Sequence, residues 1–181
     1  MRKQCGLSLI EMMITVAIAA ILVTIGAPGI GNILQKNNVV ADLNNLSTIA
    51  RVARFTAIDE EIPVTVCPTH DYTDCSTDWR QAKMVFIDTN TNGSRDTSEV
   101  LITSSDALAQ GNTIAGIQDA LIFNPDGSIN QQATVTICPA SGNQKLASAL
   151  IISLYGRVAA ATDANNDGIR EDADGNNISC T

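Results

Sequence analysis

One apolar run near the N-terminus constrains this chain more than any other feature. The segment Leu7–Ile30 reads LSLIEMMITVAIAAILVTIGAPGI, and Glu11 is its one charged side chain. A helix rises ~1.5 Å per residue, so about 20 apolar residues cross a bilayer. Arg2 and Lys3 precede the run, and no basic residue follows until Lys36. The positive-inside rule therefore predicts a short cytoplasmic head and an exported remainder.

Glu11 is the unusual residue of this run, because a carboxylate is costly within a bilayer and is usually functional there. The structural alternative is a position near the start of the helix, where the helix dipole favours an acidic side chain. A secretory signal peptide is the alternative for the whole run. It would need a small-residue cleavage site afterwards, and Ala27-Pro28-Gly29 matches such a site poorly.

The residues Gly6-Leu7-Ser8-Leu9-Ile10-Glu11 resemble the class III leader of type IV pilins and pseudopilins. The resemblance implies that a prepilin peptidase removes residues 1–6 by cutting after Gly6, and that Leu7 is then methylated. It also implies a role in assembly for Glu11, whose buried carboxylate can pair with the free amine of Leu7 on a neighbouring subunit. Pro28 stands where the family often has proline, and it should bend or locally melt the helix.

Charge and composition argue against nucleic-acid binding and catalysis. The chain has 11 Lys+Arg against 19 Asp+Glu, a formal charge of −8, and cleavage after Gly6 would remove Arg2 and Lys3 and leave −10. Phosphate binding depends on clustered cations, and base stacking needs aromatic residues, which make up only 3%. His70 is the single histidine, and no G-x-S-x-G, P-loop or H-E-x-x-H motif is present. An enzyme is therefore not expected.

The rest of the chain predicts an α+β fold, in which a long helix packs on an antiparallel β-sheet. The helix continues to about Asp59, because apolar residues recur at steps of three and four. These are Val39, Leu43, Leu46, Ala50, Ala53 and Ala57, with Ile49, Val52 and Ile58 widening the stripe. Alternation then predicts strands at residues 63–67, 83–88, 100–103, 120–124, 133–138 and 149–158. The expected organisation is a leader of residues 1–6, a membrane or filament helix of residues 7–30, and a head of residues 31–181.

Four cysteines remain after residue 6, and disulfide bonds are the expected state in an exported domain. Three pairings are open, and we favour Cys67–Cys75, which closes a small loop, with Cys138–Cys180, which ties down the C-terminal tail. The alternative is a metal site formed by Cys67, His70 and Cys75 with Asp71 or Asp74, although this spacing is not a familiar one for zinc.

Two acidic loops match the pattern D-x-[DN]-x-[DN]-G, in which alternating oxygens converge on Ca²⁺. The candidate ligands of the first loop are Asp88, Asn90, Asn92, Asp96 and Glu99. Those of the second are Asp163, Asn165, Asp167 and Asp174, the last in place of the closing glutamate. The alternative is a polar turn, since Asn, Asp and Gly also favour turns. No cofactor other than this candidate calcium is expected.

The soluble part resembles the FimT/FimU/GspH group of minor pilins and type II secretion pseudopilins. The resemblance rests on the order of several short motifs: Ala50-Arg51, Val64-Thr-Val-Cys67 with Trp79 following, Val85-Phe86-Ile87-Asp88 with the first acidic loop, Ile122-Phe123-Asn124, and Tyr155-Gly156-Arg157-Val158. The first acidic loop belongs to this family pattern, which favours a hairpin over a dedicated calcium site.

The resemblance implies a minor type IV pilin that helps to prime pilus assembly, in a tip complex, and supports twitching motility or adhesion. A secretion pseudopilin of the GspH type is the first alternative, a DNA-uptake minor pilin the second, and a membrane-anchored adhesin outside any filament the third. The implied partners are other pilins and the prepilin peptidase. The implied location is the inner membrane, with a periplasmic head, and then a pilus or a periplasmic pseudopilus.

Overall fold

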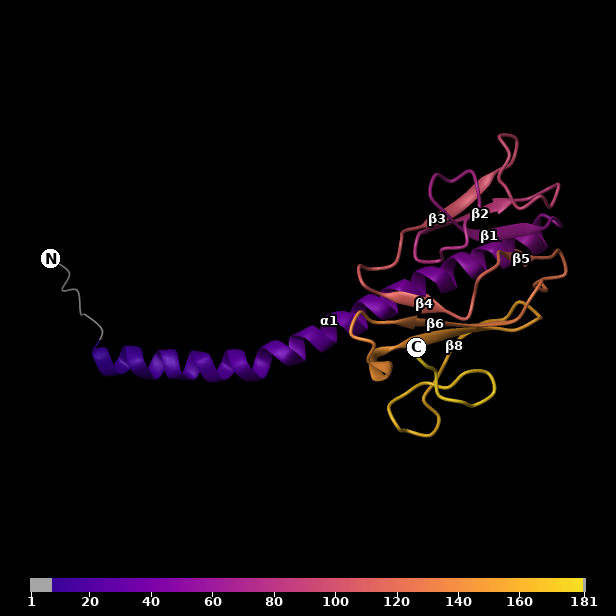
Figure 1. Ribbon diagram of the computed structural model, residues 1–181. Coiled ribbons are helices and arrows are strands. Elements are labelled where there is room, and N and C mark those ends of the chain that lie inside the picture. The colour runs from indigo at the N-terminus through magenta and orange to yellow at the C-terminus, as the bar shows by residue number, and fades with distance from the viewer. Residues whose placement is uncertain (1–7, 181) are drawn as a thin grey trace. The chain divides into compact units, whose positions relative to one another are not determined.

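A single helix, α1 (Leu9–Asp59), forms the N-terminal part of the structure (Figure 1). The computed structural model describes residues 8–180, leaving aside the side chains of residues 25–28. At the end of α1, the Glu60 N–H donates to the Thr56 carbonyl at 2.9 Å, and Glu61 adopts a left-handed φ of 55°. Such a residue commonly ends a helix, and Pro63, which lacks an N–H donor, follows it.

The chain divides into two compact units, residues 1–34 and 35–181, and each is considered by itself. In the first unit, the large apolar side chains of α1 are exposed, from 53% for Ile18 to 79% for Leu9. An 18-residue window of α1 has a mean hydropathy of 2.4 and is not buried. By length and composition this segment is a candidate membrane span, and so much exposed apolar surface needs lipid or other helices around it.

The second unit contains two antiparallel four-stranded sheets, with strand orders β3-β2-β1-β5 and β4-β6-β7-β8. The first sheet comprises β1 (Val64–Thr69), β2 (Ala82–Ile87), β3 (Leu101–Ser105) and β5 (Leu121–Phe123). The second comprises β4 (Thr113–Ala115), β6 (Ala133–Cys138), β7 (Ser148–Ile152) and β8 (Val158–Ala160), with a short 3₁₀ helix, η1 (Gln144–Leu146), before β7. Because β1 lies between β2 and β5, both of its edges are paired, and its six residues are all buried.

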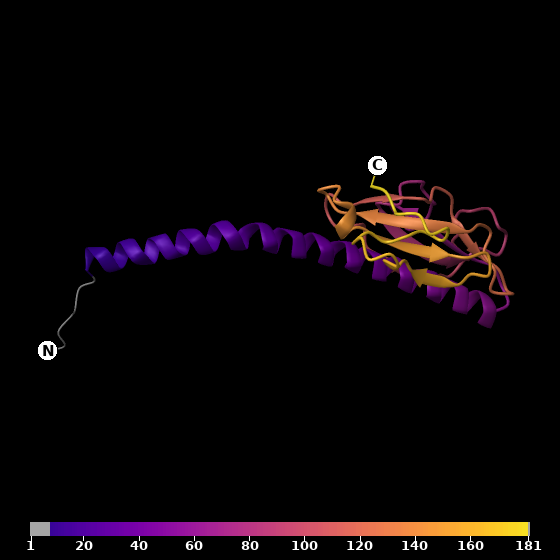
Figure 2. The same cartoon turned by 90° about the horizontal axis from the view of Figure 1, so that it is seen from below.

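The C-terminal part of α1 supplies one wall of the core and runs along the sheets (Figure 2). Every member of the predicted stripe is buried: Val39, Leu43, Leu46, Ala50, Ala53 and Ala57. They pack with side chains of both sheets, such as Phe123 and Ile137. Ile58 was expected to widen the stripe but is 42% exposed. The α+β interpretation is therefore confirmed, with a helix packed on antiparallel strands.

The sheet pattern differs from the prediction in three ways. The strands form two sheets instead of one. The expected strand 149–158 is divided, because a turn closed by the Gly156 N–H and the Ser153 carbonyl separates β7 from β8. The short β4 was not predicted. It lies between Gly111 and Gly116, which both have positive φ, and so offers little alternation to recognise.

A small polar cluster lies within the second unit, where α1 meets the loop after β3. The buried Asp42 carboxylate accepts hydrogen bonds from the Ala109 N–H at 3.1 Å and from Asn112 Nδ2 at 2.7 Å. Lys83 is only 3% exposed, and its Nζ has one long hydrogen bond, 3.5 Å to the Asp106 carbonyl. Burial lowers the pKa of Lys83 to about 8, against the opposing charges of Asp42 and Asp78. The fold therefore disfavours the charged ammonium.

We expect Lys83→Met to stabilise the head by roughly 1–3 kcal/mol at pH 7, since the buried charge is removed and the alkyl stem is kept. Between pH 8 and 10.5 the unfolded chain binds the Lys83 proton more tightly than the fold does, so wild-type stability rises with pH across this window. The advantage of the variant should accordingly shrink by pH 9.5. Urea unfolding at both pH values measures this, with the exposed Lys145→Met as control. An equal difference at both pH values would contradict the prediction.

Candidate functional site

The N-terminal end of α1 holds the one carboxylate of the apolar segment. Ser8 caps the helix, because its Oγ accepts a hydrogen bond from the Glu11 N–H at 3.3 Å. Glu11 lies in the first turn, where the positive end of the helix dipole favours its charge. The cap and the helix dipole therefore support the alternative in which Glu11 serves only the start of the helix. Gly6 and Leu7, the predicted processing site, lie outside the described residues, and cleavage there stays a prediction.

The Glu11 side chain is exposed and has no hydrogen-bond or ion-pair partner among residues 8–180. Its neighbours on the helix are apolar and exposed as well, with Ile10 at 68% and Met13 at 66%. If these apolar side chains are covered by lipid or by other helices, the carboxylate loses water without gaining an internal partner. Such a group favours a counter-charge from outside the described residues, and the assembly role of Glu11 stays a prediction.

The predicted bend at Pro28 is not accompanied by a break in the helix. Residues 26–31 are helical, so the local melting expected there is not observed. The side chain of Pro28 lies outside the description, and a bend in this segment stays a prediction.

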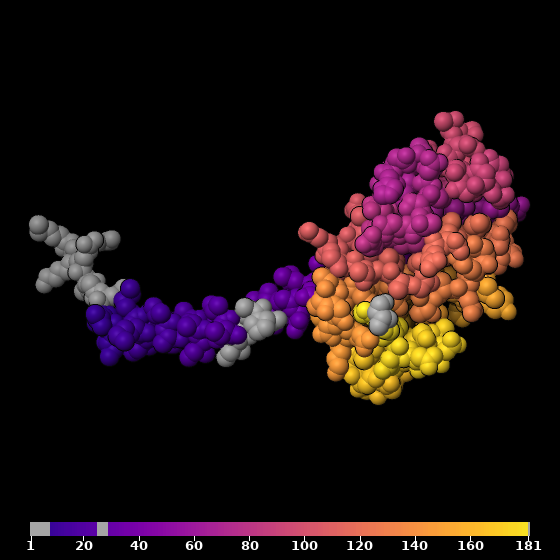
Figure 3. Space-filling view, in the orientation of Figure 1, coloured from indigo at the N-terminus to yellow at the C-terminus, as the bar shows by residue number. Residues whose placement is uncertain are grey.

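The two favoured disulfide bonds are confirmed. Cys67 bonds to Cys75, eight residues on, and Cys138 bonds to Cys180, 42 residues on. The first bond excludes the alternative metal site, because both thiols that would bind the metal are oxidised. The second bond holds the tail, whose Ile178 packs with Cys138, Ala149 and Ala161 in a small cluster of its own. Figure 3 shows the tail as a yellow lobe on the surface of the head.

In the first acidic loop, the carboxylates accept hydrogen bonds from the backbone N–H groups of the loop itself. The Asp88 carboxylate accepts from the N–H groups of Asn92 and Gly93, each at 3.1 Å. Glu99 accepts from the Thr89 N–H at 2.8 Å and the Asp96 N–H at 3.0 Å. Burial opposes the charge on Glu99, but these hydrogen bonds outweigh it, and the pKa of Glu99 lies below its ordinary value. Asn90 and Asn92 donate to the Asp96 carboxylate, at 2.7 and 3.3 Å.

The second loop has a similar hydrogen-bond pattern, but its closing glutamate stands at an earlier position in the loop. Asp163 accepts from the Gly168 N–H at 2.9 Å, as Asp88 does from Gly93. Asn165 accepts from the Asp167 N–H at 2.8 Å. The closing carboxylate is Glu171, which accepts from the Ala164 N–H at 2.8 Å.

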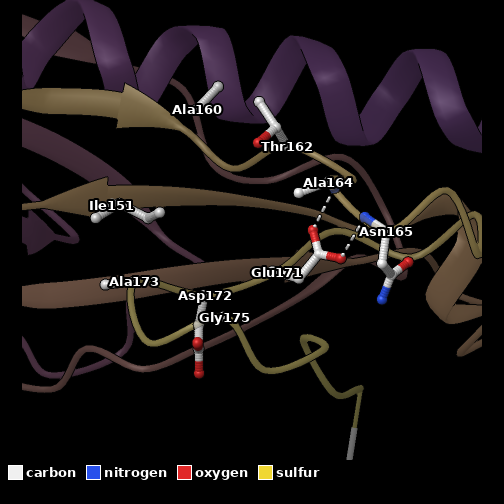
Figure 4. Close-up of a pocket in the computed structure, with 9 residues that line it drawn as sticks. All are labelled: Ile151, Ala160, Thr162, Ala164, Asn165, Glu171, Asp172, Ala173 and Gly175. Carbon is white, nitrogen blue, oxygen red and sulfur yellow. Dashed lines mark hydrogen bonds between the residues drawn. The ribbon is translucent and has the colours of Figure 1, made fainter.

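The sequence pattern had assigned the closing position of this loop to Asp174. The Asp174 N–H instead donates to Asp172 Oδ1 at 2.9 Å, in a separate turn. Sequence reasoning missed Glu171 because the motif fixes the closing acid at the twelfth position. Figure 4 shows Glu171 directed at Ala164 and Asn165, and the Asp172 side chain pointing away from it. Hydrogen bonds from Asn177 and the Ile169 N–H keep the pKa of Asp167 below its ordinary value.

Calcium at either loop stays a prediction. Residues 8–180 contain no group of three or more His, Cys, Asp or Glu side chains arranged to hold a metal ion. In both loops, carboxylate oxygens that would bind the ion accept backbone N–H groups. These hydrogen bonds account for the residue types at these positions without a ligand.

Comparison with known proteins places these features in a family. A family model described as type II transport protein GspH matches residues 42–156, and one described as the prokaryotic N-terminal methylation motif matches residues 1–27. The first match spans more than half of the chain and lies within the head. The second covers the candidate processing site, Glu11 and most of the apolar run. A search of curated proteins finds no match.

Two solved structures share the fold. The type IV minor pilin FimU of Pseudomonas aeruginosa is 19% identical, with a TM-score of 0.57 over 70% of this chain and 90% of that one. The minor pseudopilin EpsH from the type II secretion system of Vibrio cholerae is 12% identical, with a TM-score of 0.51 over 68% and 95%. At these identities the likeness shows a common fold.

Proposed function

The chain belongs to the GspH family, a group of minor pilins and pseudopilins, and we propose that it is a minor pilin of a type IV pilus. The observation that carries the proposal is the combination of a methylation motif with a GspH-type head on a single helix. In this proposal a prepilin peptidase cuts after Gly6 and Leu7 is methylated. The helix anchors the chain in the inner membrane, with the head in the periplasm, until the chain enters a filament.

Assembly is the step at which Glu11 acts in this proposal. A filament core of packed apolar helices has no polar feature to set the axial register of one subunit against the next. The Glu11 carboxylate and the amine of Leu7 on a neighbouring subunit would provide that register, because each would be buried without a partner in any other position. The chain would thus work as a structural subunit in the complex that primes the pilus and forms its tip.

The preference for a pilus over a secretion filament rests on the head. A pilus exposes its subunits outside the cell, where shear and proteases act on them. Two disulfide bonds, one of which fastens the acidic tail, suit that exposure. The family description and the EpsH fold support the alternative, a pseudopilin of a type II secretion system. DNA uptake is a weaker second alternative, because the chain is acidic.

Deletion of the gene in the native host separates these functions. We expect surface pili recovered by shearing, and twitching motility, to fall at least about tenfold, while secretion of folded exoproteins stays unchanged. A plasmid copy of the wild-type gene should restore both. Loss of secretion with normal pili would show instead that the chain is a pseudopilin of a secretion system. Loss of DNA uptake alone, with pili and secretion intact, would support the DNA-uptake alternative.

A further inference from the structure

Three arginines line one groove of the head, beside the C-terminal part of α1. The groove has a volume of about 510 Å³. It is lined by Arg51, Arg54, Phe55, Ile58, Gly156, Arg157 and Val158, and we call it the arginine groove. Its residues come from α1 and from the turn and first residue that lead into β8, so the fold brings Arg157 to the two arginines of the helix.

Two of the guanidinium groups are held in place by backbone carbonyls. Arg51 donates through Nη2 to the Val158 carbonyl at 2.9 Å, and Arg54 donates through Nε to the Gly127 carbonyl at 3.0 Å. Gly156, at a φ of 67°, makes this arrangement possible, because a Cβ there would collide with the Gly127 carbonyl and press on Arg54. The groove is therefore pre-organised, and less side-chain entropy is lost when it binds a partner.

No ion pair among the described residues neutralises the positive charge of the groove. The one ion pair among residues 8–180 joins Arg80 and Asp78, and no acidic residue lines the groove. The Arg157 side chain is exposed and makes no hydrogen bond or ion pair in the described chain. These three arginines are a third of the basic residues that remain after residue 6 of a strongly acidic chain. Guanidinium groups in this state favour carboxylates or other planar anions.

Apolar surface accompanies the charge. Phe55 is 69% exposed and Ile58 is 42% exposed, although both belong to a helix whose other face forms the core. Arginine and aromatic side chains together are the composition typical of the energetic centre of a protein interface. A partner that uses the whole groove would carry carboxylates for the arginines and an apolar side chain for Phe55.

We propose that the arginine groove binds a short acidic segment, with an apolar anchor residue, on a neighbouring filament subunit. The proposal rests on the filament function proposed above and adds to it the site and the chemistry of one contact. A protein segment fits better than a nucleic acid, because the whole chain is strongly acidic and repels a long polyanion. A short segment meets only the local charge of the groove.

Reversal of the Arg157 charge tests the groove in the full-length chain. Arg157→Glu removes no side-chain hydrogen bond or ion pair among residues 8–180, so the fold should persist. We expect its processed form in sheared filaments to fall about tenfold relative to wild type. The control is Lys145→Glu, an equal charge change at an exposed site outside the groove, which should stay within about twofold. Equal recovery of both variants would overturn the proposal. A wild-type chain missing from every filament would instead contradict the proposed function.

Photo-crosslinking identifies the occupant. Phe55 is replaced by p-benzoylphenylalanine in the full-length chain in the native host, with the same replacement at Tyr72 as a control. We expect adducts with one peptide of another subunit, rich in Asp and Glu, and their loss when Arg157→Glu is added. Adducts with nucleic acid or phospholipid, or none above the Tyr72 control, would overturn the proposal. An acidic peptide from an envelope protein outside filaments would support the groove and contradict the proposed function.

Discussion

Glu11→Ala is expected to leave processing and membrane insertion intact and to reduce the chain in filaments roughly 100-fold. The carboxylate has no partner within the described chain, and it lies among exposed apolar side chains of α1. In a filament it would be buried against the amine of Leu7 on a neighbour. Breaking a buried pair by removing one member costs about 3–5 kcal/mol, because the other charge stays buried alone.

Quantitative mass spectrometry of sheared filaments and of the envelope measures this effect. Glu11→Gln keeps the shape of the side chain without its charge and should fail similarly, while Glu60→Ala, at an exposed acidic site just after α1, serves as the matched control. Wild-type incorporation of Glu11→Ala would show that Glu11 serves only the local helix start. Accumulation of uncut precursor would place its role in processing instead.

Loss of the Cys138–Cys180 bond is expected to destabilise the head by about 4 kcal/mol, and loss of Cys67–Cys75 by about 2.5 kcal/mol. The difference follows from the loops that the bonds close, which span 42 and 8 residues in sequence. A longer loop restricts the unfolded chain more strongly. The small apolar cluster beneath the tail, including Ile178, would also lose its covalent fastening.

Each pair is replaced by serines, as Cys138→Ser with Cys180→Ser and as Cys67→Ser with Cys75→Ser. Urea unfolding of the full-length chain in detergent is followed by the fluorescence of Trp79, the single tryptophan, which is buried in the core of the head. Each pair is the control for the other. A smaller loss for the 138–180 pair than for the 67–75 pair would contradict the loop argument.

Local patterns in the sequence predicted much of this fold. The spacing of Val39, Leu43 and Leu46 indicated the buried face of α1, since helical geometry alone determines which residues share a face. Residues 125–128, Pro-Asp-Gly-Ser, have the composition of a turn, and there the Gly127 N–H donates to the Asn124 carbonyl at 2.8 Å. Export and the even number of thiols predicted disulfide bonds, and the small loop closed by Cys67 and Cys75 favoured the observed pairing.

Apart from the disulfide bonds, features that depend on contacts distant in sequence were not predicted. The place of β5 in the first sheet depends on its pairing with β1, and no local pattern encodes this pairing. The arginine groove was not predicted, because Arg51 and Arg157 are far apart in the chain and come together only in the fold. In the second acidic loop, Glu171 takes the closing position three residues earlier than the motif specifies, where it accepts from the Ala164 N–H.

If the chain is a processed filament subunit, its N-terminal peptide has lost residues 1–6, and the mass of that peptide shows whether this is so. Sheared surface filaments and the remaining envelope of the native host would be digested and compared. We predict a peptide that begins at methylated Leu7, present in the sheared filaments. A processed chain confined to the envelope would favour the secretion pseudopilin. A chain that begins at Met1 in both fractions would contradict the proposed function and leave α1 as an ordinary membrane anchor.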